Sequence, residues 1–115
     1  MLLLAACRPA LEKQVVGEWS SGCSIDICTI TVLRADHTFS ERFDQKDLPK
    51  PVFSGTWRFE RDQLVLHVTW ELESKKVQSI VGRDLRYAIS DVQQDSLVAT
   101  LLEPHNEPEH WKRRH

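Results

Sequence analysis

The sequence predicts an all-β protein, a single small antiparallel up-and-down barrel of about eight strands. Short runs of alternating apolar and polar residues fill the chain from Gln14 to Glu103, with turn signals between them. The connections are too short for the crossover of a dozen or more residues that a parallel pair needs. A closed barrel is favoured over the alternative, a β-sandwich, because closure removes the exposed edges of a sheet.

The first half of the chain alternates strand signals with turn and loop signals. Asp26–Arg34 is rich in Ile, Thr and Val, which fit a pleated surface. Ala35-Asp36-His37 reads as a tight turn, after which Thr38–Asp44 returns. Gln45–Pro51 is expected to be a loop, because its two prolines and three charged residues do not suit a central strand.

The second half continues the pattern, with Arg61-Asp62, Glu71–Lys76, Gly82-Arg83-Asp84 and Gln93-Gln94-Asp95 as its turns. Gln63–Trp70 alternates in the expected way, with Leu64, Leu66, Val68 and Trp70 on one face and His67 on the other. The full set of predicted strands is Val15–Ser20, Asp26–Arg34, Thr38–Asp44, Val52–Glu60, Gln63–Trp70, Val77–Val81, Leu85–Val92 and Ser96–Leu102.

Length and composition indicate one ordinary globular domain. The chain has 115 residues, of which 41% are hydrophobic and 28% charged. Its 15 Lys and Arg against 17 Asp and Glu give a net charge of −2, which argues against a nucleic-acid partner. We expect a signal-peptide remnant and lipid-attachment motif over 1–7, a linker over 8–13, the barrel over 14–103 and a flexible polar tail over 104–115.

The N-terminal segment Leu4-Ala5-Ala6-Cys7 resembles the lipobox of bacterial lipoproteins. The resemblance implies that Cys7 carries the lipid and anchors the protein to a membrane. Arg8 after that cysteine resembles the sorting signal for the periplasmic side of the outer membrane. Only six residues precede Cys7, fewer than a signal peptide needs. Either the true start lies upstream, or these residues form a short apolar arm of a cytoplasmic protein.

The other two cysteines, Cys23 and Cys28, have the spacing C-x4-C. If Cys7 is lipidated, they form an even pair that suits a disulfide in an oxidising compartment. Two alternatives stay open: unlinked buried thiols, or two ligands of a metal. A structural zinc site needs four ligands, and no second pair exists in the sequence.

Two G-x-W motifs, Gly17-Glu18-Trp19 and Gly55-Thr56-Trp57, resemble the motif of lipocalins and of lipocalin-like bacterial domains. Asp36-His37-Thr38-Phe39 resembles a hairpin of the same small domains, and the segment from Arg61 to Leu66 resembles the turn and strand that follow the second motif. The resemblance covers about half the chain and implies an up-and-down barrel. We identify no counterpart of the later T-D-Y segment of lipocalins, nor of the basic residue of their last strand that packs on the first tryptophan.

The sequence contains no common enzyme motif, so we predict a protein without catalytic residues, metal or cofactor. His105 and His110 stand five residues apart, a spacing that matches no standard metal site, and Pro108 would break any helix between them. His67 is expected on the outer face of its strand.

Glu41 is the unusual residue of the predicted interior. It lies between Phe39 and Phe43 on the same strand face, where a carboxylate is costly unless it is paired, neutralised or reached by water. Such a position indicates a ligand contact, an internal salt bridge or a place at the barrel mouth. Our candidate ligand-binding residues in the lumen are Phe39, Glu41, Phe43, Trp57 and Tyr87.

Two functions follow as hypotheses. The first is a lipid-anchored envelope protein that binds a small apolar ligand in its barrel or serves as an envelope accessory. The second is a periplasmic protein-interaction module, an inhibitor or immunity protein of a cell-wall hydrolase, that acts through Gln45–Pro51 or the Cys23–Cys28 region.

Overall fold

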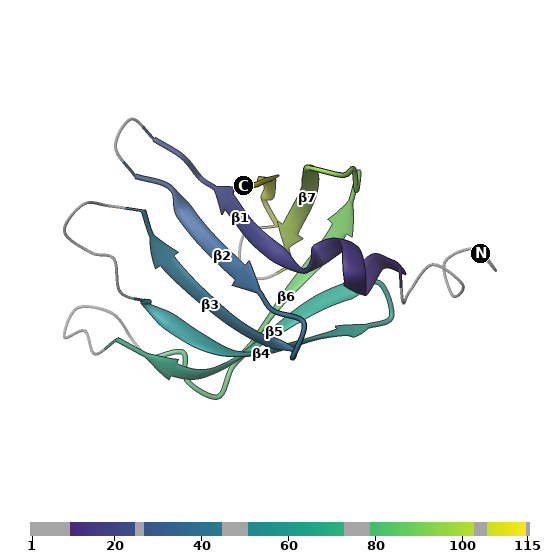
Figure 1. Cartoon of the computed structure of the whole chain (residues 1–115). Helices are drawn as coiled ribbons and strands as arrows, with labels where there is room; N and C mark the ends of the chain where they lie inside the picture. Colours follow the sequence, from purple (N-terminus) through teal and green to yellow (C-terminus); the bar gives the residue numbers. More distant parts are fainter. Residues whose placement is uncertain (1–9, 25–26, 45–50, 73–78, 103–105, 115) are drawn as a thin grey trace.

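A computed structural model describes residues 10–24, 27–44, 51–72, 79–102 and 106–114 of the chain. Within these residues, eight antiparallel strands form a closed barrel in which each strand pairs with the next and the last pairs with the first (Figure 1). The strands are β1 (Gly17–Ser21), β2 (Thr29–Leu33), β3 (Thr38–Phe43), β4 (Phe53–Glu60), β5 (Gln63–Glu71), β6 (Asp84–Ser90), β7 (Ser96–Leu101) and β8 (Pro108–Arg113). The prediction of an up-and-down barrel is confirmed, and the sandwich is excluded.

The eighth strand is not the segment that the sequence predicts. We predicted a strand over Val77–Val81. Residues 79–81 are the described part of this segment, and none of them lies in a strand. Pro108–Arg113, which we assigned to a flexible tail, is β8 and pairs with both β7 and β1. Pro108 is tolerated because it is the first residue of the strand, where a missing N–H does least harm.

A short helix over residues 10–15 lies at one end of the barrel, where the sequence predicts a linker (Figure 1). Val15 on this helix is fully buried in the core, and Leu11 packs against the same core. The indole N–H of Trp19 donates a hydrogen bond of 2.8 Å to the carbonyl oxygen of Val15. We call this end of the barrel the closed end. Among the described residues, no helix is long and apolar enough to cross a membrane.

Large aromatic side chains fill the core of the barrel. The buried residues of this core that have the largest volumes are Trp19, Trp57, Trp111 and Phe39. Trp111 lies 6.5 Å from Trp19 and Tyr87 lies 5.6 Å from Trp111, measured between ring centroids. Such aromatic packing removes a large apolar area from water and supplies much of the stability of a small barrel.

Both glycines of the G-x-W motifs lie where a side chain would collide with a neighbouring group. A Cβ atom at Gly17 would collide with the guanidinium of Arg113, and the φ angle of Gly17, +147°, favours glycine. A Cβ atom at Gly55 would collide with the backbone carbonyl of His67. The register between β4 and β5 shifts between Ser54 and Gly55, so this glycine lies at a bulge where two backbones approach closely.

The bulge also decides where Trp70 points. We expected Trp70 on the same face as Leu64, Leu66 and Val68, which are all fully buried. Trp70 is instead 47% exposed, because one extra residue on β5 reverses the alternation beyond Val68. The prediction that Trp70 is an inward aromatic residue is therefore wrong.

Arg113 of β8 joins the two ends of the chain. Its guanidinium lies 4.3 Å above the ring of Trp19. It donates hydrogen bonds to the carbonyl oxygens of Gln14 at 2.6 Å, Val16 at 2.8 Å and Gln94 at 3.0 Å. A basic residue of the last strand therefore packs on the first tryptophan, a contact that was not predicted from the sequence.

We expect Arg113→Ala to lower the free energy of unfolding by about 2–4 kcal/mol, because it removes three charge-assisted hydrogen bonds and a cation–π contact. Arg113→Lys should recover only part of this loss, since an ammonium lacks the planar fork of a guanidinium. Urea unfolding followed by tryptophan fluorescence measures both. Arg114→Ala is the matched control: it removes an exposed ion pair with Asp44 and should cost less than about 1 kcal/mol. Equal losses for Arg113→Ala and Arg114→Ala would contradict this role.

Cys23 and Cys28 form a disulfide in the connection between β1 and β2, as the sequence predicts. Their Cα atoms are 4.0 Å apart. The bond joins the residue two positions after β1 to the residue just before β2. The alternatives of free thiols and of a metal site at these two residues are thereby set aside.

Candidate ligand-binding site in the barrel lumen

The strand registers place a row of polar side chains inside the barrel, away from the closed end. Thr31 pairs with Glu41 across β2 and β3, and Glu41 pairs with Phe53 across β3 and β4. Directly paired residues of an antiparallel sheet point to the same face. Because Phe53 packs against the core, Thr31 and Glu41 also point inward.

Glu109 of β8 reaches the lumen from the other side. It pairs with Ala99, which is fully buried in the core, and its neighbour Trp111 two positions on is also a core residue. The indole N–H of Trp111 donates a hydrogen bond of 3.2 Å to Oε1 of Glu109. Burial raises the pKa of Glu109, and this hydrogen bond partly opposes that rise.

The Glu41 carboxylate has no hydrogen bond or ion pair with any residue that the structure describes, although its backbone is paired in the sheet. Burial, and then the negative charge of Glu109, raise the pKa of Glu41 to about 8. Burial also raises the pKa of Tyr87, with added contributions from the charges of Glu41 and Glu109. These three side chains, from β3, β6 and β8, therefore share one region of the lumen.

Water reaches this region. Ser21 is 6% exposed and Thr31 is 3% exposed, and their hydroxyl groups, like the Glu41 carboxylate, have no protein partner among the described residues. Within that part of the chain, no fully enclosed side-chain nitrogen or oxygen lacks a hydrogen bond. The unpartnered groups must therefore keep contact with solvent, so the lumen is open at this level while the closed end is packed.

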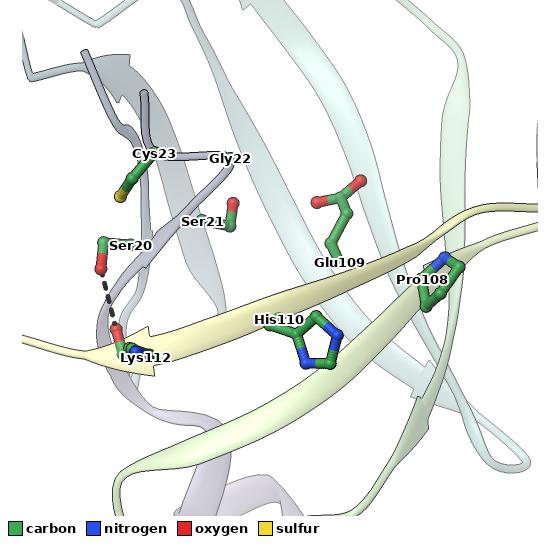
Figure 2. Close-up of a pocket in the computed structure, with 8 residues that line it drawn as sticks. All are labelled: Ser20, Ser21, Gly22, Cys23, Pro108, Glu109, His110 and Lys112. Atoms are coloured by element: carbon green, nitrogen blue, oxygen red, sulfur yellow. Dashed lines mark hydrogen bonds between the residues drawn. The ribbon is translucent and has the colours of Figure 1, made fainter. Parts of the chain in front are cut away.

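An opening of about 380 Å³ lies between β1 and β8 (Figure 2). Its walls carry the polar groups Ser20, Ser21, Glu109, His110 and Lys112. Figure 2 shows the Glu109 carboxylate and the Ser21 hydroxyl on one side of β8 and His110 on the other side. We call this opening the β1–β8 pocket. It is lined by the inward residues Ser21 and Glu109 and also by residues of the outer face, Ser20, His110 and Lys112.

The lumen residues that the sequence suggested do not all lie together. Phe39 and Trp57 are packed in the core, and the indole N–H of Trp57 donates a 2.8 Å hydrogen bond to the carbonyl of Arg34. Tyr87 and Glu41 lie in the polar region described above. Phe43 is 39% exposed at the end of β3, so it belongs to the rim rather than to the interior. Cys7 lies outside the described residues.

Sequence reasoning missed Ser21, Thr31 and Glu109. Glu109 alternates with Trp111 and Arg113, as the inward residues of a strand do. Only one of these three residues is apolar, so the pattern does not stand out as the inner face of a strand. For Ser21 and Thr31, small hydroxyl side chains at inward positions have no signature that separates them from outward ones.

The outer face of β4–β6 carries a separate set of ion pairs. His67 lies on this outer face, as predicted, and its Nδ1 is 2.7 Å from Oδ1 of Asp84. Arg58 and Arg86 pair with Glu60 and Asp84 on the same surface. The hydrogen bond from His67 is the main cause that lowers the pKa of Asp84. Each charge in this set has an opposite partner, so it leaves no charge free for a ligand.

The described residues contain no group of three or more His, Cys, Asp or Glu side chains arranged to hold a metal ion. Of the histidines in the C-terminal segment, His110 lies on β8, while His105 and His115 fall outside the described residues. No protein-family model matches the chain, and no curated protein matches it either.

Glu41→Gln tests whether the carboxylate is unpaired. The pKa of Glu41 rises from 4.5 to about 8 on folding, so the folded state holds its proton more tightly and loses stability as the pH rises through that range. The glutamine amide does not ionise, so the variant does not lose this stability as the pH rises. We expect the variant and the wild type to be equally stable at pH 4, and the variant to be more stable at pH 8 by roughly 1–3 kcal/mol.

Urea unfolding at the two pH values measures this difference. Glu107→Gln, at an exposed position before β8, is the control and should change stability little at either pH. A Glu41→Gln variant that is less stable than the wild type at pH 8 would mean that Glu41 is a paired charge.

Proposed function

We propose that this protein is a non-enzymatic, lipid-anchored protein of the bacterial envelope whose barrel binds a small ligand with an apolar body. The observation that carries the proposal is the unequal filling of the barrel. Its closed end is packed with aromatic side chains, whereas its other half holds the unpartnered polar groups of Ser21, Thr31 and Glu41. Eight strands leave room for one small ligand, and a few polar groups in an apolar site are typical of ligand pockets.

The envelope location is supported by two features of the chain. The segment ending at Cys7 resembles a lipobox, which supports a lipid anchor at this cysteine. The Cys23–Cys28 disulfide is the kind of bond that persists in an oxidising compartment and is rare in the bacterial cytosol. Both features agree with a protein on the periplasmic side of the outer membrane.

The second candidate function, a protein-interaction module, is favoured by one observation. Among the residues that the structure describes, four large apolar side chains are exposed: Phe43, Trp70, Leu72 and Val81. Backbone hydrogen bonds from Val52 to Glu41 and from Leu72 to Val52 bring the ends of β3 and β5 to the same rim. An inhibitor or immunity protein would use such a rim, although most of the Gln45–Pro51 loop lies outside the described residues.

Fluorescence titration with N-phenyl-1-naphthylamine, an apolar dye that is uncharged at pH 7, tests the ligand-binding proposal. We expect saturable enhancement of dye fluorescence by the wild-type protein. Ser21→Phe should reduce it at least tenfold by filling the lumen. Ser40→Phe is the matched control, because Ser40 alternates with the inward residues Phe39 and Glu41 and does not line the β1–β8 pocket. Its substitution on the outer face should leave dye binding unchanged.

The two variants are compared after circular dichroism shows that both are folded. Absence of saturable dye binding by the wild type would overturn the proposal. Equal binding by Ser21→Phe and Ser40→Phe would also overturn it, because the dye would then be bound outside the lumen.

A further inference from the structure

The barrel wall opens between β1 and β8. The ladder between these strands contains the pairs Trp19–Arg113 and Ser20–Lys112. The next positions in this register, Ser21–Trp111 and Gly22–His110, are not paired, and no backbone hydrogen bond joins Gly22 to His110. Pro108 lacks an N–H, and the disulfide at Cys23 holds the chain beyond β1 against the β2 side. The β1–β8 pocket occupies the resulting gap.

Two polar groups in this pocket are available to a ligand. The Ser21 side chain is more than nine-tenths buried, has no partner among the described residues and lines the pocket. The Glu109 carboxylate points to the same side of β8 as the Ser21 hydroxyl (Figure 2). Because Trp111 donates to Oε1 of Glu109, the Oε2 atom is left to accept from a ligand.

No described cation faces these groups from inside the barrel. Arg113 is the inward basic residue of β8, and its guanidinium is held at the closed end by Trp19 and three carbonyl oxygens. His110 and Lys112 alternate with Glu109 and Trp111, so they lie on the outer face of β8. The region around Glu41, Glu109 and Tyr87 therefore carries acidic groups without a basic partner.

We propose that the β1–β8 pocket binds the protonated amine of an amphiphilic ligand, with the ammonium between Glu109 and Ser21 and facing Glu41. This inference rests on the proposed function and names the class of ligand. The aromatic pair Tyr87 and Trp111 lies next to Glu109, since Trp111 donates to its Oε1, and these rings also attract a cation. A metal ion fits less well, because the described residues offer it fewer than three grouped ligands. A neutral alcohol leaves both carboxylates uncompensated.

Isothermal titration calorimetry of the purified protein with hexylammonium, hexanol and hexanoate tests the inference. At pH 8.5 we expect hexylammonium to bind at least tenfold more tightly than hexanol, and hexanoate to bind least. Glu109→Gln and Glu41→Gln should each reduce the preference for hexylammonium over hexanol by about tenfold. Glu107→Gln is the charge-matched control outside the pocket and should keep the preference.

The affinity for hexylammonium should also rise between pH 6 and pH 9. Glu41 loses its proton in this range, while an alkylamine with a pKa near that of lysine, about 10.4, stays charged. Glu109, Tyr87, His110 and Lys112 are the other titratable groups around the pocket. The rise in affinity should persist in His110→Gln and be reduced in Glu41→Gln. This comparison shows whether the pH dependence comes from the Glu41 carboxylate or from the His110 imidazole.

The outcomes distinguish this inference from the proposed function. Dye binding in the lumen, together with equal affinity for hexylammonium and hexanol, would overturn the amine inference and leave the ligand-binding proposal standing. Absence of binding of both the dye and hexylammonium would overturn both. Retention of the amine preference by Glu109→Gln and Glu41→Gln, when both variants are folded, would overturn the placement of the ammonium.

Discussion

The contact between the Arg113 guanidinium and Trp19 holds together parts of the chain that are far apart in the sequence. It joins β8 to β1 and, through the carbonyl oxygens of Gln14 and Val16, to the residues that lead into the first strand. Gly17 has no side chain at the place where this guanidinium passes. The closure of the barrel, the position of the helix over its end and the need for glycine in the first G-x-W motif all depend on this interaction.

The same closure divides the interior into two unlike halves. Near Arg113 and Trp19, buried aromatic and aliphatic side chains pack together. Towards the other end, the β1–β8 ladder ends after Ser20 and Lys112, and the polar groups of Ser21, Glu41 and Glu109 face an interior that solvent reaches. Unpaired carboxylates in such a place reduce the stability of the free protein. A binding function explains why the chain contains them, since a ligand cation would remove this cost.

Much of the fold could be predicted because most strands alternate apolar and polar residues, and Glu41 stood out because it interrupts an alternating run between Phe39 and Phe43. The eighth strand escaped prediction because two of its inward residues, Glu109 and Arg113, are charged. Their burial is acceptable only through partners that the fold supplies, namely Trp111 and the carbonyl groups near β1. The bulge at Gly55 reverses the direction of Trp70, and the backbone contact that causes it has no signature in the residue pattern.

Native-state amide hydrogen exchange of β8, followed by NMR, tests most directly whether this strand closes the barrel. The N–H of Arg113 donates to the carbonyl oxygen of Asp95 and the N–H of Arg114 donates to that of Glu18, each at 2.8 Å. If β8 closes the barrel, both amides should exchange as slowly as those of the central strand β5, through global unfolding. Exchange at the rate of an unstructured chain, with β5 still protected, would contradict the account and return Pro108–Arg113 to a loose tail.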